Sequence, residues 1–62
     1  MQVMLNGEET PVSDGTTLGD LVGSAGGRAA AVNGVVVPRD QHRQTRLADG
    51  DVVEIVTAVQ GG

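Results

Sequence analysis

The longest predicted strand of the chain decides the fold, and it reads Val52-Val53-Glu54-Ile55-Val56-Thr57-Ala58-Val59. Its β-branched residues favour a strand over a helix. Because Glu54 should point to solvent, Val53, Ile55, Thr57 and Val59 share one face, and Val52, Val56 and Ala58 lie beside Glu54 on the other. This second face either binds a partner or carries the scatter of small aliphatic side chains that is normal on surfaces.

Two strands are predicted at the start of the chain. Gln2 to Asn6 alternates apolar and polar positions, which is the period of a half-buried strand. Met4 falls on the face opposite the buried one, so we take Met4, Val56 and Ala58 as candidate docking residues. Asn6-Gly7 has the sequence of a tight hairpin turn. In the return strand, Glu8 to Val12, the proline restricts the strand to a sheet edge or a strand end.

A short helix is predicted next. Thr17 and Asp20 have the spacing of a capping box, so the helix should begin there. The apolar residues that follow at i, i+3, i+4 and i+7 are Leu18, Leu21, Val22 and Ala25, which form one stripe. Gly26-Gly27 ends the helix.

Two further strands follow the helix. Ala29 to Val32 and Val35-Val36-Val37 are joined by a second Asn-Gly turn, Asn33-Gly34, and Pro38 ends the second strand. The order is strand, strand, helix, strand, strand, irregular turn, strand, which a β-grasp domain requires. The sequence therefore predicts an α+β protein with a mixed sheet of four to five strands on one helix. We expect one domain over 1–62, with a flexible Gly-Gly tail at 58–62.

The segment from Arg39 to Arg46 contains no apolar side chain, so it is a surface loop or a single helical turn. Leu47 is its predicted anchor in the core. We expect His42 to be solvated or to cap a helix, because this segment cannot build the cleft that a catalytic base needs. Asp49-Gly50-Asp51 is interpreted as a turn before the last strand, since it lacks the other ligands of a calcium loop.

The composition excludes several classes of function. The sequence has 62 residues, with Lys+Arg 4, all of them Arg, against Asp+Glu 8, for a net charge of −4. No basic stripe for nucleic acid can be drawn. No apolar run reaches the ~18 residues of a membrane span, and the N-terminus lacks the pattern of a signal peptide, so we expect a cytoplasmic protein.

Enzymatic chemistry is also disfavoured. The chain has no Cys and no aromatic residue, and so small a domain can scarcely enclose a ligand pocket of ~300 Å³. We therefore predict no catalytic residue of its own, no metal site and no bound cofactor.

The final residues, Val59-Gln60-Gly61-Gly62, are the strongest candidate for chemistry. Two glycines can lie extended in a narrow tunnel where any Cβ would clash. A carboxylate presented in this way on Gly62 can be activated as an acyl-adenylate by another enzyme, while Gly61, Gln60 and Val59 thread the tunnel. The alternative is a frayed tail without function.

These features together resemble the sulfur-carrier proteins of thiamin biosynthesis, the ThiS family of the ubiquitin-like β-grasp group. The matching stretches are Asn6-Gly7, Ala31-Val32-Asn33-Gly34, Val37-Pro38-Arg39, Leu47-Ala48-Asp49-Gly50-Asp51, Val53-Glu54-Ile55-Val56 and Ala58-Val59-Gln60-Gly61-Gly62. They cover essentially the whole chain. One departure is His42, where the family often carries an aromatic residue after Val-Pro-Arg.

The resemblance implies a mechanism in which the chain is a cosubstrate and not an enzyme. A ubiquitin-activating-type adenylyltransferase (ThiF-like) would use ATP to adenylate the carboxylate of Gly62. Sulfur from a cysteine desulfurase or another donor would convert it to a thiocarboxylate, and a thiazole synthase (ThiG-like) would take that sulfur.

Several alternatives stay open at this point. The small subunit of molybdopterin synthase and the carriers of cysteine or natural-product pathways share the fold and the tail. A ubiquitin-like protein modifier is a second class, although the absence of Lys disfavours chains of modifiers. A plain interaction module is the third.

Overall fold

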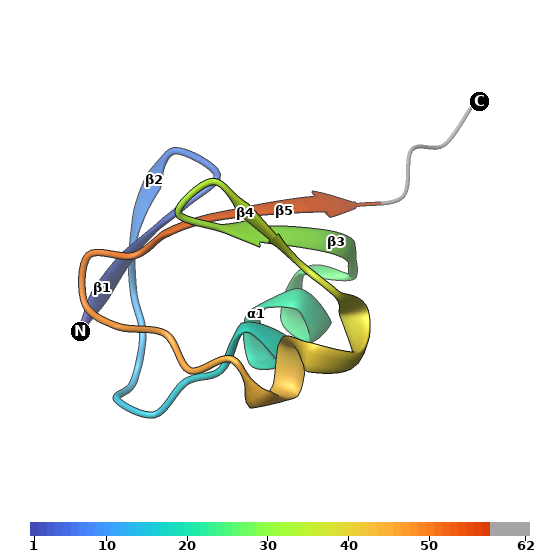
Figure 1. Ribbon diagram of the computed structural model, residues 1–62. Coiled ribbons are helices and arrows are strands. Elements are labelled where there is room, and N and C mark those ends of the chain that lie inside the picture. The colour runs from blue at the N-terminus through green and yellow to red at the C-terminus, as the bar shows by residue number, and fades with distance from the viewer. Residues whose placement is uncertain (58–62) are drawn as a thin grey trace.

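In the part of the chain that the structure describes, residues 1–57, a five-stranded sheet carries one α-helix on one face (Figure 1). The coordinates are those of a computed structural model. The elements are β1 (Gln2–Leu5), β2 (Glu8–Pro11), α1 (Leu18–Ala25), β3 (Gly27–Val32), β4 (Val35–Val37), the 3-10 helix η1 (Arg39–Gln44) and β5 (Val52–Thr57). The predicted element order and α+β class are confirmed.

The sheet order is β2-β1-β5-β3-β4, so the last strand of the sequence lies in the middle of the sheet. β5 runs parallel to β1, where Met4 pairs with Val52 and Leu5 with Val53. All other neighbours are antiparallel. In Figure 1, β5 starts on the side where the N-terminus lies and crosses the molecule to end on the opposite side.

Both Asn-Gly pairs form the tight turns that the sequence predicts. Asn6 and Gly7 have φ angles of 49° and 83°, and Asn33 and Gly34 have 52° and 83°. Two consecutive residues in the left-handed region match the twist of a two-residue hairpin, and Asn followed by Gly adopts it at the lowest cost. The two hairpins, β1–β2 and β3–β4, flank β5.

The helix begins at the capping box that the sequence predicts. The hydroxyl of Thr17 accepts a hydrogen bond from the Asp20 amide at 3.2 Å, and the Asp20 carboxylate accepts one from the Thr17 amide at 3.0 Å. Gly26 ends the helix in the left-handed conformation, with φ 66°. An eight-residue helix depends on such caps and on packing, because short helices are marginal alone.

The third strand begins two residues earlier than predicted, at Gly27. A Cβ on Gly27 would lie too close to Cγ2 of Ile55 and 3.3 Å from Cγ1 of Val22, so only glycine lets the strand approach so closely here. The register on β5 shifts between Gly27 and Ala29, which leaves Arg28 as the extra residue of a bulge.

The core lies between α1 and the covered face of the sheet. Its buried hydrophobic residues are Val3, Leu18, Val22, Ala30, Leu47, Val53 and Ile55. The apolar stripe of the helix is only half confirmed, because Leu18 and Val22 are buried while Leu21 is half-buried and Ala25 is exposed. Leu47 is buried, so its predicted role as an anchor is confirmed.

His42 corrects a prediction from the sequence. The side chain is only 4% exposed, whereas the sequence predicted a solvated or helix-capping histidine. Its Nε2 lies 2.9 Å from the carbonyl oxygen of Val37. η1 packs against α1 and β3, and the imidazole is the one buried side chain of this polar segment. This hydrogen bond allows a polar ring to be buried. The polar residues on both sides of His42 in the sequence had instead indicated an exposed side chain.

None of the helices in the described part of the chain is long and apolar enough to cross a membrane.

Candidate functional site

The residues predicted to carry the chemistry lie at the very end of the sequence. Ala58, Val59, Gln60, Gly61 and Gly62 are outside the described residues. The structure does describe the strand that leads to them. β5 ends at Thr57, which pairs with Gly27 at the start of β3. Three features of the described residues bear on the site: the contacts that hold β5 in the sheet, the face of the sheet to which β5 belongs, and the charged side chains near the end of β5.

The hairpin residue Asn6 holds β5 beyond the point where β1 ends. Its side-chain oxygen accepts from the amide of Ile55 at 2.8 Å, and its side-chain amide donates to the carbonyl of Ile55 at 3.3 Å. The backbone amide of Asn6 donates to the carbonyl of Val53 at 2.9 Å. The side chain thus replaces the backbone partner that a longer β1 would supply.

Asn33, in the turn of the other hairpin, also holds β5 through its side chain, on the side that faces β3. Its side-chain oxygen accepts from the amide of Val52 at 2.9 Å, and its backbone amide donates to the carbonyl of Val52 at 2.7 Å. Its side-chain amide donates to Asp51 at 3.1 Å. The sequence marks Asn6 and Asn33 only as turn residues, so their second role was missed. The choice of Asn was the available signal. Asp or Gly also fits this position of the turn, but only the Asn side chain can both donate and accept a hydrogen bond.

The face of the sheet away from α1 is open, and we call it the open face. It is formed by the side chains that alternate with the buried ones, namely Met4, Glu9, Ala29, Ala31, Val36, Val52, Glu54 and Val56. Val36, Val56 and Val52 are 73%, 59% and 46% exposed. The predicted position of Glu54 on the solvent side is confirmed.

Two shallow hollows divide the open face. One of about 210 Å³ is lined by Ala29, Ala30, Ala31, Val36, Glu54 and Val56. The other, of about 230 Å³, is lined by Gln2, Val3, Met4, Glu9, Asp49 and Gly50. The predicted docking residues Met4 and Val56 therefore share a face but lie in separate hollows. Both hollows are smaller than the usual ligand pocket, which favours a protein partner over a small molecule.

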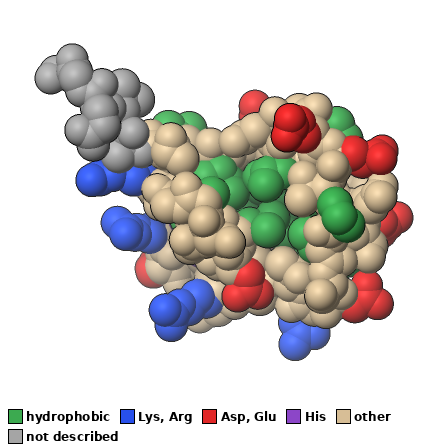
Figure 2. Space-filling view, turned by 180° about the vertical axis from the view of Figure 1, so that it is seen from behind, with side chains coloured by type: hydrophobic (Ala, Val, Ile, Leu, Met, Phe, Trp, Pro, Cys, Tyr) green, Lys and Arg blue, Asp and Glu red, His purple; other side chains and the backbone are tan. Residues whose placement is uncertain are grey.

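The charged side chains are partly separated across the molecule. In Figure 2 most arginines lie towards the side on which β5 ends and most carboxylates lie towards the other side, while an arginine also lies among those carboxylates. Hydrophobic side chains are exposed between the two groups. Within residues 1–57 the ion pair that forms joins the Met1 ammonium to Asp14 at 3.7 Å. The four arginines thus have no ion-pair partner in the described part of the chain.

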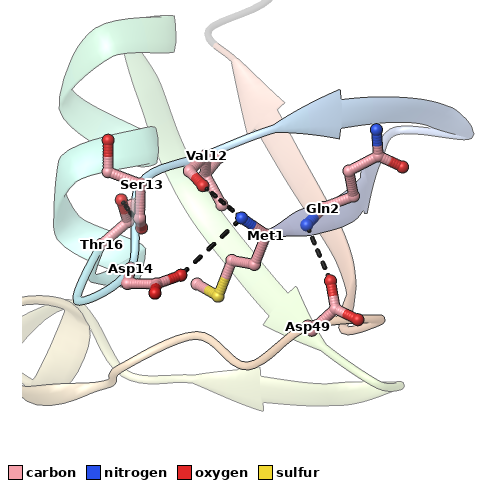
Figure 3. A network of polar contacts seen from close by, with 7 residues as sticks. All are labelled: Met1, Gln2, Val12, Ser13, Asp14, Thr16 and Asp49. Atoms are coloured by element: carbon pink, nitrogen blue, oxygen red, sulfur yellow. Dashed lines mark hydrogen bonds and ion pairs between the residues drawn. The ribbon is translucent and has the colours of Figure 1, made fainter.

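Several carboxylates are instead used by the backbone around the first residues (Figure 3). The Met1 ammonium donates to the carbonyl of Val12 at 2.9 Å, and the amide of Gln2 donates to Asp49 at 2.8 Å. Asp51 accepts from the amide of Ala48 at 2.8 Å. Asp49-Gly50-Asp51 is thus a turn before β5, as predicted. The Asp51 carboxylate closes the turn onto Ala48, and the Asp49 carboxylate joins it to the start of β1.

The described residues hold no cluster of three or more His, Cys, Asp or Glu side chains suited to a metal ion. His42 is enclosed and bonded to the backbone, so its ring is not presented to a substrate. What residues 1–57 offer to chemistry is a rigidly held strand, an open apolar face beside it, and arginines near its end.

This combination defines a small β-grasp protein with an open sheet face on both sides of the strand that leads to its terminal glycines. The chain belongs to the ThiS family, whose model matches residues 3–62. It is also similar to the crystal structure of a thiamine biosynthesis protein (ThiS) from Geobacter metallireducens, with a TM-score of 0.78 and 25% identity over 100% of both chains. The predicted family and the β-grasp fold are confirmed.

A curated relative is longer than the chain. A thiazole synthase of Paramagnetospirillum magneticum is 38% identical over 66 residues, which cover 100% of this chain and 20% of the relative. The chain thus spans one fifth of the length of that relative.

Proposed function

We propose that the chain is a sulfur carrier for the synthesis of the thiazole part of thiamin. The observation that carries this proposal is the family match, which extends over residues 3–62 and so includes the terminal Gly-Gly. In this function the chain is a cosubstrate and not a catalyst. Its cytoplasmic location stays a prediction.

The reaction begins at the carboxylate of Gly62. An adenylating enzyme of the ThiF type joins it to the AMP part of ATP and releases pyrophosphate, which turns a poor leaving group into a good one. The terminal sulfur of a persulfide, supplied by a cysteine desulfurase or another donor, then displaces AMP and forms an acyl disulfide. A thiol cleaves the sulfur–sulfur bond, which releases the thiocarboxylate and leaves a disulfide on the donor side. Gly61, Gln60 and Val59 pass through the tunnel of the enzyme. At positions 61 and 62 this tunnel has no room for a side chain, so both residues have to be glycine.

The last acceptor in this proposal is a thiazole synthase. The similarity to a protein named thiazole synthase supports this acceptor over the molybdopterin and cysteine pathways, which share the tail. The open face with Met4 and Val56 supplies the contact area, because the strand that leads to the tail, β5, lies in the middle of this apolar surface. Ala58, the third predicted docking residue, lies outside the described residues.

The test is a sulfur-transfer assay read by mass spectrometry. The chain is incubated with the adenylating enzyme, ATP and a sulfur source, and should gain the mass of one sulfur in exchange for one oxygen. A chain lacking Gly62 is the control: it should keep the circular dichroism spectrum of the wild type and gain nothing. An unchanged wild-type mass, in conditions where a known carrier reacts, would show that the proposal is wrong.

A second assay separates the thiazole role from the alternatives. Thiocarboxylated chain is offered to thiazole synthase and, separately, to the large subunit of molybdopterin synthase. Sulfur should be lost only to the first. Loss to the second alone would assign the chain to the molybdopterin pathway.

A further inference from the structure

Two arginines, Arg28 and Arg39, flank the end of β5. Arg28 is the extra residue of the β3 bulge, because Gly27 pairs with Thr57 and Ala29 pairs with Val56. Such bulges redirect a side chain and are favoured beside functional sites. Here the bulge lies at the last described pair of the ladder, directly before the tail, and it leaves Arg28 exposed.

Arg39 follows the neighbouring strand β4. Val37, the last residue of β4, pairs with Ala30 in an antiparallel ladder, so the chain runs from there through Pro38 to Arg39 towards the end of β3 that carries Arg28. Arg39 is exposed, like Arg28, and is the first residue of η1. Neither guanidinium forms an ion pair within residues 1–57.

The acidic side chains leave this end of the molecule positive, although the net charge is −4. Glu8 and Glu9 lie on β2, at the far edge of the sheet, and Asp49 and Asp51 lie before the start of β5. Asp40 is the exception, but it forms no ion pair with its neighbour Arg39 in the described structure. In Figure 2 most arginines lie towards the side on which β5 ends, and most carboxylates lie towards the other side.

We propose that Arg28 and Arg39 form a docking patch for carboxylates on the adenylating enzyme, at the opening that admits the tail. This inference rests on the proposed function. The guanidinium group binds carboxylates through two parallel hydrogen bonds, which fixes orientation as well as position. Nucleic acid is not the partner, because phosphate binding needs a longer basic stripe than two arginines on an acidic protein provide.

The test measures the thiocarboxylation rate against carrier concentration for Arg28→Glu, Arg39→Glu and the double variant. Contacts between charges on the rim of an interface act mainly on association and its salt dependence, so KM of the double variant should rise about tenfold with kcat unchanged. Added salt should raise the KM of the wild type and lower that of the double variant, because it screens an attraction in the first and a repulsion in the second.

Arg46→Glu is the matched control, since it makes the same change of charge at an exposed arginine beside Thr17, where α1 begins. Its KM should stay near that of the wild type. Arg28→Glu should also unfold at the same denaturant concentration as the wild type, because the Arg28 side chain is exposed and forms no ion pair in the described structure. If Arg28 had a purely structural role, its substitution would lower the stability of the fold. A rise in KM without a loss of stability therefore indicates a role in docking.

The outcomes separate this proposal from the proposed function. If the wild type reacts and the double variant keeps the wild-type KM, or shifts it no more than Arg46→Glu does, the docking patch is wrong and the sulfur-carrier function stands. If the wild type neither binds the adenylating enzyme nor gains sulfur, both proposals are overturned.

Discussion

Gly27 shows how one residue without a side chain shapes the base of the candidate site. Alanine there would bring a Cβ too close to Cγ2 of Ile55, in a core that has no room to yield. We expect Gly27→Ala to lower the free energy of unfolding by about 1–3 kcal/mol, which is the usual cost of overpacking. Urea denaturation measures this change.

Gly23→Ala is the control for that substitution. Gly23 is an exposed helix position where an added Cβ meets nothing within 4 Å. Because alanine is the better helix former, this change should raise the free energy of unfolding by about 0.5–1 kcal/mol. If Gly27→Ala and Gly23→Ala both raised the free energy of unfolding, or both lowered it, the close approach of Gly27 to Ile55 would be contradicted.

Asn6 is the second residue whose role can be isolated. Asn6→Gly keeps the positive φ of the turn and removes both side-chain bonds to Ile55. We expect a loss of about 1 kcal/mol, the usual net value of a hydrogen bond, and faster hydrogen exchange of the Ile55 amide. Asn6→Asp retains the acceptor oxygen, so it should preserve more of that protection. Equal exchange rates in all three proteins would show that the side chain does not hold β5.

At the scale of elements, η1 is a polar segment held in place by one buried ring. His42→Ala would leave a cavity and remove the hydrogen bond to the carbonyl of Val37. We expect a loss of about 2–3 kcal/mol in urea denaturation. Gln41→Ala, at an exposed position of the same helix, should change stability by less than about 0.5 kcal/mol. Similar effects of the two substitutions would mean that the imidazole is not an anchor.

The sequence predicts the elements well where the signal is local. The two Asn-Gly turns, the Thr17 capping box and the alternation in β5 each depend on neighbouring residues, and all three are confirmed. The start of β3 was missed because the need for glycine at position 27 comes from Ile55, far along the chain. His42 was missed because its burial depends on the packing of η1 against α1 and β3, which its polar neighbours in the sequence do not indicate.

In the candidate site, too, the sequence predicts what depends on neighbouring residues and misses what depends on distant ones. Alternation places Met4 and Val56 on one face correctly, since a strand has a fixed period. It cannot show that they lie in separate hollows, or that the asparagine side chains bond to β5. Those facts depend on the sheet order, which brings together residues from both ends of the sequence.

At the scale of the whole molecule, the open face is tested by Val56→Asp. A carboxylate on this face should weaken binding to the adenylating enzyme or to thiazole synthase about tenfold, because it places an unpaired charge in an apolar interface. Titration calorimetry measures the affinity. Val35→Asp is the matched control: Val35 is 67% exposed and lies next to Val36 on β4, so its side chain points away from the open face. Equal loss in both variants, or none in either, would remove the open face as the docking surface.

The central position of β5 also sets an order for folding. Each hairpin closes over a two-residue turn, whereas the bond between Asn6 and Ile55 spans 49 residues. Contacts between residues so far apart in the sequence form slowly, since the chain must lose more entropy before it gains them. The strand that leads to the reactive end should therefore be the last to join the sheet. An incompletely folded or damaged chain would still have the terminal glycines, but it would lack the surface that an activating enzyme has to bind. Sulfur would then be loaded only onto molecules whose folding is complete.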